Sequence, residues 1–176
     1  MITNNTVVIN IIAGPCAGKS TTAAQLFSEL KKVGMSVELL QEPIKSHIYE
    51  DYRGILTHQI ALFGEQLFKL DSLVGKVDCV VNDGSLLLNA VYDQSNNQLF
   101  KALVMQEYNR FKNLDFFINR GDLEFKEDGR IHNYEQSLML DKKIKDVYEF
   151  ANASYIEVNS TTAVDEILTH IQSFGK

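Results

Sequence analysis

The chain has little of what marks secreted, membrane or nucleic-acid-binding proteins. Its 176 residues include two cysteines, two prolines and no tryptophan. Two cysteines, Cys16 and Cys79, cannot form the disulfide framework of a small secreted domain. The first apolar run, residues 7–13, is too short for a membrane span and does not fit a signal peptide. We therefore expect a cytoplasmic protein that makes no membrane contact.

Basic residues are also scarce. The chain carries 17 Lys and Arg against 23 Asp and Glu, a formal net charge of −6. This balance gives no general attraction to nucleic acid or to an anionic membrane, so we expect neither as a partner. With 45% hydrophobic residues, residues 1–176 suit one domain with a substantial core. These features are compatible with a homodimer.

The clearest motif lies near the N-terminus, where residues 7–22 join an apolar run of strand length to a glycine-rich turn and a helix pattern. The turn matches G-x-x-x-x-G-K-[ST], except that Ala13 stands at the first glycine. In this motif successive backbone N–H groups and the positive end of a helix dipole bind phosphates. The predicted phosphate-binding residues are Gly14, Pro15, Cys16, Ala17, Gly18, Lys19, Ser20 and Thr21.

Three of these residues have specific expected roles. Lys19 is placed to bridge the β- and γ-phosphates, and the Ser20 hydroxyl is the expected Mg²⁺ ligand. A side chain at Gly18 would block the approach of the backbone to the phosphates. The motif therefore predicts a bound nucleoside triphosphate with Mg²⁺.

The rest of the chain alternates between strand and helix patterns. We expect strands at residues 7–13, 36–41, 78–83, 116–119 and 155–158. Helices are expected at residues 18–32, 44–76 with a break at 53–54, 84–92, 96–112, 136–152 and 162–173. This alternation predicts an α/β fold with a parallel sheet, in which ligands bind beyond the carboxyl ends of the strands. Residues 120–134, with two glycines and mixed charge, are the expected lid.

Charged residues follow several of the expected strands. Glu42 is a candidate base for an acceptor hydroxyl, and Asp83 is a candidate Walker-B-type carboxylate that would share the Mg²⁺ with Ser20. Arg120 and Arg130 are candidate catalytic cations that would close over the phosphates with the lid. Each could instead be a solvated surface charge, although a carboxylate directly after an apolar strand needs a partner.

These features, in their order along the chain, resemble the P-loop nucleoside and nucleotide kinases over nearly the whole length. The residues that carry the resemblance are AGPCAGKSTT, QEP, HQIALFGEQ, NDGS and DGR. The chain is most similar to deoxynucleoside kinases, thymidylate kinase, nicotinamide-riboside kinase domains and small kinases of bacteriophages. The resemblance implies a three-layer fold with a lid and a five-stranded parallel sheet in the order 2-3-1-4-5.

The resemblance also implies site residues. It makes Glu42 the base, and it places Gln59 and Gln66 on the helix that reads the edge of the substrate base. Phe63, on the same helix, would be a stacking surface, or it could be a core residue. One departure is clear, because Gly84 stands where the deoxynucleoside kinases usually have Arg.

The leading hypothesis is an ATP- and Mg²⁺-dependent kinase of a nucleoside or nucleoside monophosphate. An alternative acceptor is a hydroxymethylated base in DNA, supported by the cluster Lys142, Lys143 and Lys145 and opposed by the acidic net charge. A different class is a P-loop switch that hydrolyses nucleotide without an acceptor.

Overall fold

The computed structural model describes residues 5–42, 58–121 and 134–174. The helical segment expected before residue 58 and most of the expected lid, including Arg130, lie outside these ranges. The elements are β1 (Val7–Ile12), α1 (Lys19–Lys32), β2 (Val37–Leu40), α3 (Gln59–Leu73), β3 (Cys79–Asp83), α4 (Leu88–Tyr92), α5 (Gln98–Tyr108), β4 (Lys112–Asn119), α6 (Tyr134–Phe150), β5 (Ile156–Asn159) and α7 (Ala163–Phe174). Within those ranges, no helix combines the length and apolarity needed to cross a bilayer.

The five strands form one parallel sheet in the order β2-β3-β1-β4-β5, as expected. Apart from Asn10, the central strand β1 is apolar on both faces, and Val8, Ile9 and Ile11 are almost fully buried. This is the pattern of a parallel strand covered on both sides by helices. The carboxyl ends of all five strands, including β1 with its glycine-rich turn, therefore meet at one edge of the sheet.

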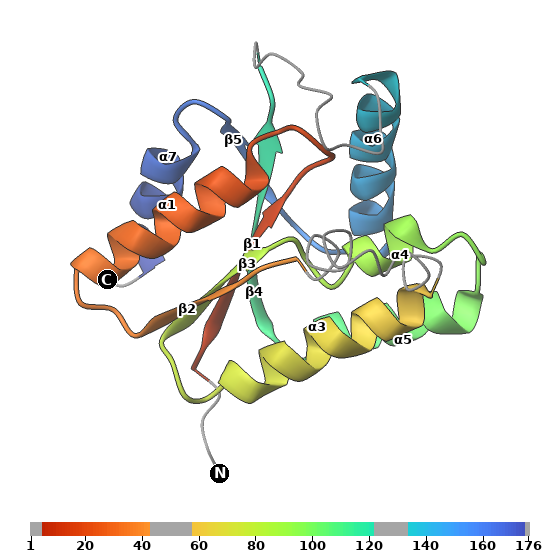
Figure 1. Cartoon of the computed structure of the whole chain (residues 1–176), viewed down its shortest axis with the longest axis horizontal. Coiled ribbons are helices and arrows are strands. Elements are labelled where there is room, and N and C mark those ends of the chain that lie inside the picture. Colours follow the sequence, from red (N-terminus) through yellow and green to blue (C-terminus); the bar gives the residue numbers. More distant parts are fainter. Residues whose placement is uncertain (1–4, 43–57, 122–133, 175–176) are drawn as a thin grey trace, which may run out of the picture.

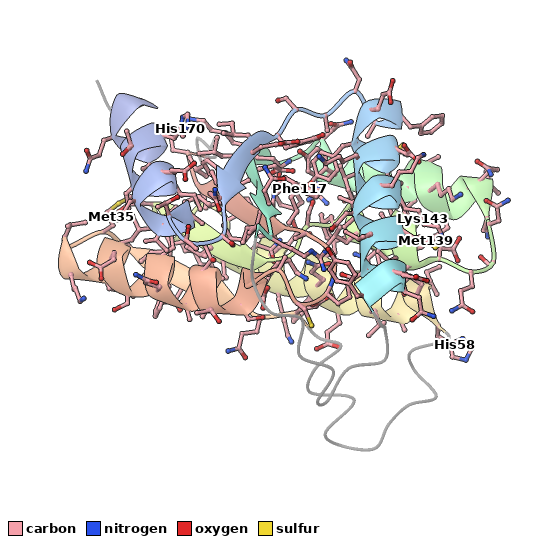
Figure 2. The ribbon with its side chains drawn as sticks, turned by 90° about the horizontal axis from the view of Figure 1, so that it is seen from above. Met35, His58, Phe117, Met139, Lys143 and His170 are labelled. Atoms are coloured by element: carbon pink, nitrogen blue, oxygen red, sulfur yellow. The ribbon has the colours of Figure 1, made fainter. Side chains whose placement is uncertain are left out.

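Helices cover both faces of the sheet (Figure 1): α1 and α7 pack on one face, and α3, α4, α5 and α6 on the other. Because successive strand residues point to opposite faces, Ile9 and Ile11 pack beneath α1 and α7, whereas Val8 and Ile12 face the other layer. Seen from above, side chains fill the space between the layers, with Phe117 of β4 in the interior (Figure 2). The three-layer α/β architecture is thus confirmed.

One boundary was predicted wrongly. We expected a helix over residues 96–112 and a strand over 116–119, but α5 ends at Tyr108 and β4 already begins at Lys112. The first half of β4 carries Asn113 and Asp115, which give the sequence no apolar strand pattern. Both side chains are hydrogen-bonded to Asn10 of the neighbouring strand, so polar contacts inside the fold hold this part of the strand.

Candidate functional site

The glycine-rich turn leads from the end of β1 directly into the N-terminus of α1. Gly18 caps the helix with φ +86°, a left-handed conformation that favours glycine. Cys16 also has a positive φ, +62°, a strained value for a residue with a side chain. The first turn of α1 carries no acidic residue, so the positive end of the helix dipole is available to an anion. Lys19 and Ser20 are the first two residues of the helix.

A buried polar cluster from β4 and α6 braces the backbone of this turn. Arg120, 7% exposed at the end of β4, donates to Asp141 Oδ2 at 2.5 Å and Ser137 Oγ at 2.5 Å. Arg120 and Ser137 Oγ both donate to the Pro15 carbonyl, at 3.0 and 2.7 Å. Asp141 Oδ1 accepts a hydrogen bond of 2.6 Å from Gly14 N. Two backbone groups of the turn are therefore held by side chains from outside it.

The position of Arg120 differs from our expectation of a lid cation. Its guanidinium is buried in an ion pair with Asp141 and lies against the backbone of the turn. Sequence reasoning missed Asp141 and Ser137. One signal was present, because the two residues are four apart and therefore share a face of the predicted helix, next to its buried residues Leu140 and Ile144.

A small, partly open cavity lies at the carboxyl ends of β2 and β3. Glu42, which follows β2, and Asp83, the last residue of β3, both line it. The two residues that we expected to lie together thus line one cavity, and their chemical roles stay predictions. The described lining is Glu42, Gln59, Leu62, Gln66, Asp83, Gly84, Ser85, Leu88, Asn89 and Tyr92.

Tyr92 connects this cavity with the phosphate-binding turn. Burial raises the pKa of its phenol, the charge of Lys19 opposes that rise, and the carboxylates of Glu42 and Asp141 add to it. All three charged groups are thus close enough to act on one hydroxyl. Sequence reasoning missed Tyr92, because as one residue of a short apolar helix it gave no sign of a site.

The predicted base-reading residues fall into two groups. Gln59 and Gln66 line the cavity and are joined through Asn89: Gln59 Nε2 donates to Asn89 Oδ1 at 2.9 Å, and Asn89 Nδ2 donates to Gln66 Oε1 at 2.8 Å. Phe63 instead belongs to the core, edge-to-face with Phe100 at a centroid distance of 5.6 Å. The interpretation of Phe63 as a stacking surface therefore gives way to its packing role.

The described residues include no cluster of three or more His, Cys, Asp or Glu that could hold a metal ion. Ser20 and Asp83, if they bind Mg²⁺, would depend on phosphate oxygens and water for the remaining ligands, as is usual for this ion. Burial raises the pKa of Cys79 to about 11, which keeps it protonated and unreactive.

The sheet order and the glycine-rich turn define a P-loop nucleotide-binding protein. A sequence profile of the AAA domain family matches residues 8–166, so the chain belongs to that family. Among solved structures, the chain is similar to the YorR protein from Bacillus subtilis in complex with phosphorylated GDP. The TM-score is 0.57 at 15% identity, over 96% of this chain and 95% of that one, so the likeness concerns the fold. A comparison with curated proteins gives no match.

Proposed function

We propose that the protein is an ATP- and Mg²⁺-dependent phosphotransferase that acts on a nucleoside or a nucleoside monophosphate. The observation that carries this proposal is the cavity that Glu42, Asp83 and three amide side chains line together. Its link to the phosphate-binding turn is Tyr92, whose pKa responds to the charge of Lys19. Phosphoryl transfer needs such a juxtaposition, because catalysis rests on positioning and on neutralising charge.

The residues divide the reaction between them. The turn and Lys19 would hold the triphosphate, and Ser20 with Asp83 would hold the Mg²⁺, which when bound neutralises phosphate charge. The Glu42 carboxylate would take the proton of the acceptor hydroxyl. The acceptor oxygen then bonds to the γ-phosphorus, the bond from the γ-phosphorus to the β,γ-bridging oxygen breaks, and ADP leaves.

A nucleoside-type acceptor is supported by the chemistry of the cavity wall. Gln59, Gln66 and Asn89 offer amide hydrogen bonds beside the apolar side chains of Leu62 and Leu88. A nucleobase has a polar edge and apolar faces, so it matches this combination. YorR was solved with phosphorylated GDP, which is a reason to include guanine nucleotides in any screen.

The alternative of DNA as the acceptor gains no support from the lysine cluster on α6. Lys142 is 2.9 Å from Asp146 and Lys145 is 2.7 Å from Glu157, so two of the three positive charges already have acidic neighbours. Lys143 is exposed (Figure 2). We therefore keep the small-molecule acceptor as the proposal.

The test is a screen for release of the nucleoside diphosphate, ADP from ATP or GDP from GTP, over nucleosides, nucleoside monophosphates, nicotinamide riboside and hydroxymethylated DNA. We expect one small acceptor to raise this release sharply in the wild type. Lys19→Ala should abolish this release, whereas Lys143→Ala, the matched control, should leave it unchanged.

Other results would refute the proposal in distinct ways. Hydrolysis that no acceptor stimulates would favour the switch protein. Release stimulated by DNA and weakened by Lys143→Ala would favour the DNA kinase. An unaltered rate in Lys19→Ala would remove the phosphate role of Lys19.

A further inference from the structure

Three polar residues form a buried row across the middle of the sheet. Asn10 of β1 is paired in register with Asn82 of β3 on one side and Asp115 of β4 on the other. All three are at most 3% exposed. Asn82 Nδ2 donates to Asn10 Oδ1 at 2.8 Å, and Asn10 Nδ2 donates to Asp115 Oδ1 at 2.6 Å. Buried polar groups require such partners, and here they lie under the α3–α6 layer.

This row continues through side chains of α3 and α4 to the cavity. Gln66 Nε2 lies 3.5 Å from Asn82 Oδ1. Asn89 Nδ2 then donates to Gln66 Oε1 at 2.8 Å, and Gln59 Nε2 donates to Asn89 Oδ1 at 2.9 Å. The five amides form a chain, named here the amide relay: Gln59, Asn89, Gln66, Asn82 and Asn10. Along the relay, each NH₂ group is directed toward the interior end at Asp115, and each carbonyl is directed toward the Gln59 end.

A backbone carbonyl fixes this orientation at the cavity end. Asn89 Nδ2 donates to the Leu86 carbonyl at 3.0 Å as well as to Gln66 Oε1. A carbonyl oxygen can only accept, so turning the Asn89 amide over would place its oxygen against two other oxygens. Asn89 must therefore present Oδ1 to Gln59, and Gln59 must donate a hydrogen bond to it from its NH₂ group.

A second anchor fixes the interior end independently. Asn113 Nδ2 donates to the carbonyls of Tyr108 and Phe111, at 2.7 and 3.3 Å. Asn113 therefore has its Oδ1 left to accept from Asn10 Nδ2, at 3.0 Å, beside the Asp115 carboxylate. Because each end is set by its own anchor, the orientation does not depend on the long contact between Gln66 and Asn82.

We propose that Gln59 is a fixed hydrogen-bond acceptor, so that the substrate is a nucleoside whose base donates an N–H to Gln59 Oε1. The proposal rests on the function proposed above. Within the described part of the chain, the Gln59 NH₂ group is engaged by Asn89, and Oε1 is the group left for a ligand in the cavity that Gln59 lines. Aligned amides polarise one another, which strengthens the acceptor at the open end.

A fixed acceptor discriminates between bases in a way that a freely turning glutamine cannot. A mobile amide can offer NH₂ to one base and oxygen to another. Gln59 would accept an N–H donor and reject a base edge that places a lone pair at the same point. Loss of the donor should weaken binding by about tenfold or more, because it leaves a partly buried acceptor unpaired.

The first test measures binding by calorimetry for matched pairs of nucleosides. Each parent is compared with an analogue that lacks one N–H donor group of the base: adenosine with purine riboside, cytidine with pyrimidin-2-one riboside, inosine with 1-methylinosine, and thymidine with N3-methylthymidine. We expect the tightest-binding parent to lose about tenfold or more in affinity in its analogue. Equal affinity of parent and analogue overturns the proposal, and so does the absence of binding by every nucleoside.

The second test uses variants. Gln59→Leu removes the acceptor, so it should bring parent and analogue to the same affinity. Gln98→Leu, on the exposed side of α5, is the matched control and should retain the full difference. A tenfold preference that survives in Gln59→Leu would show that another residue reads the donor.

The third measurement needs neither a variant nor a ligand. In ¹⁵N-labelled wild type, the side-chain NH₂ protons of Gln59 should exchange with water much more slowly than those of Gln98. Equally fast exchange would refute the fixed orientation.

Failure of this inference can be told apart from failure of the proposed function. If a base without the donor is phosphorylated as fast as its parent, the inference is wrong and the kinase stands. If no acceptor is phosphorylated at all, the kinase is wrong, and the binding series still decides what Gln59 recognises.

Discussion

Replacing Gly14 by alanine tests whether the brace from α6 shapes the phosphate-binding turn. A Cβ atom at this position would lie 2.7 Å from Asp141 Oδ1 and 2.8 Å from the Ser137 carbonyl oxygen. Gly14 does not have a positive φ, so crowding is the whole effect. The Ser137 oxygen belongs to the backbone, and no side-chain rotation relieves that contact. Either α6 or the turn must move.

The expected cost follows from two contributions. Overpacking of a close-packed site costs about 1–3 kcal/mol, and weakening the Gly14 N–H bond to the Asp141 carboxylate adds about 1 kcal/mol or more. A total of about 2–4 kcal/mol should lower the Tm by about 5–15 °C in a chain of this size. Urea unfolding followed by circular dichroism measures the free energy, and calorimetry with a non-hydrolysable ATP analogue measures the nucleotide Kd, which should rise by about tenfold.

Gly64→Ala is the matched control for this substitution. Gly64 lies within α3, and a Cβ atom there would have no heavy atom within 4 Å. Alanine is the better helix former, so this variant should be more stable than the wild type by about 0.5–1 kcal/mol. The two substitutions are thus expected to act in opposite directions. If Gly14→Ala unfolds at the wild-type midpoint and binds nucleotide with the wild-type Kd, the brace plays no part in shaping the turn.

Arg120→Met leaves the carboxylate of Asp141 without its buried partner and should cost about 3 kcal/mol in urea unfolding; Arg110→Met, which breaks exposed ion pairs, should cost less than about 1 kcal/mol, and equal costs would contradict this. Glu42→Gln should lower turnover by about 10²-fold while sparing ATP binding; wild-type turnover would exclude Glu42 as the base. Burial raises the pKa of Asp115 from 3.8 to about 6, so the folded state holds a proton that the unfolded state has lost, and stability should fall as the pH rises from about 4 to 6. Asp115→Asn should remove about 2–3 kcal/mol of this decline, and an unchanged slope in pH-dependent unfolding would refute the assignment.

Much of the fold could be predicted because its signals are local. The apolar strands β1 and β3, the glycine-rich turn and the spacing of the helices can all be identified in the sequence, and the resemblance supplied the strand order. Glu42 and Asp83 could be placed together because the carboxyl ends of parallel strands share an edge. These predictions needed no knowledge of which side chain contacts which.

The rest depended on contacts between distant parts of the chain. Asn113 and Asp115 look like surface residues by composition, yet they are satisfied by Asn10, more than 100 positions away. Arg120 was expected to be a lid cation. Its partners Ser137 and Asp141 come after the expected lid in the sequence, so their contact with Arg120 could not be predicted from it. A polar residue gives the same signal in sequence whether water or a buried partner satisfies it, so pattern analysis could not place these residues in the interior.

The distribution of polar groups between the two faces of the sheet bears on function as well as on stability. The face under α1 and α7 is packed with apolar side chains, whereas the face under α3–α6 carries the amide relay and Asp115. Burying an amide costs free energy unless every donor and acceptor is satisfied, and apolar residues in its place would often be no less stable. Leucine residues at the positions of the relay would therefore give about the same stability. What leucine could not supply is an oriented carbonyl at the wall of the cavity, and this is why the polarity of the relay belongs with the recognition of a ligand.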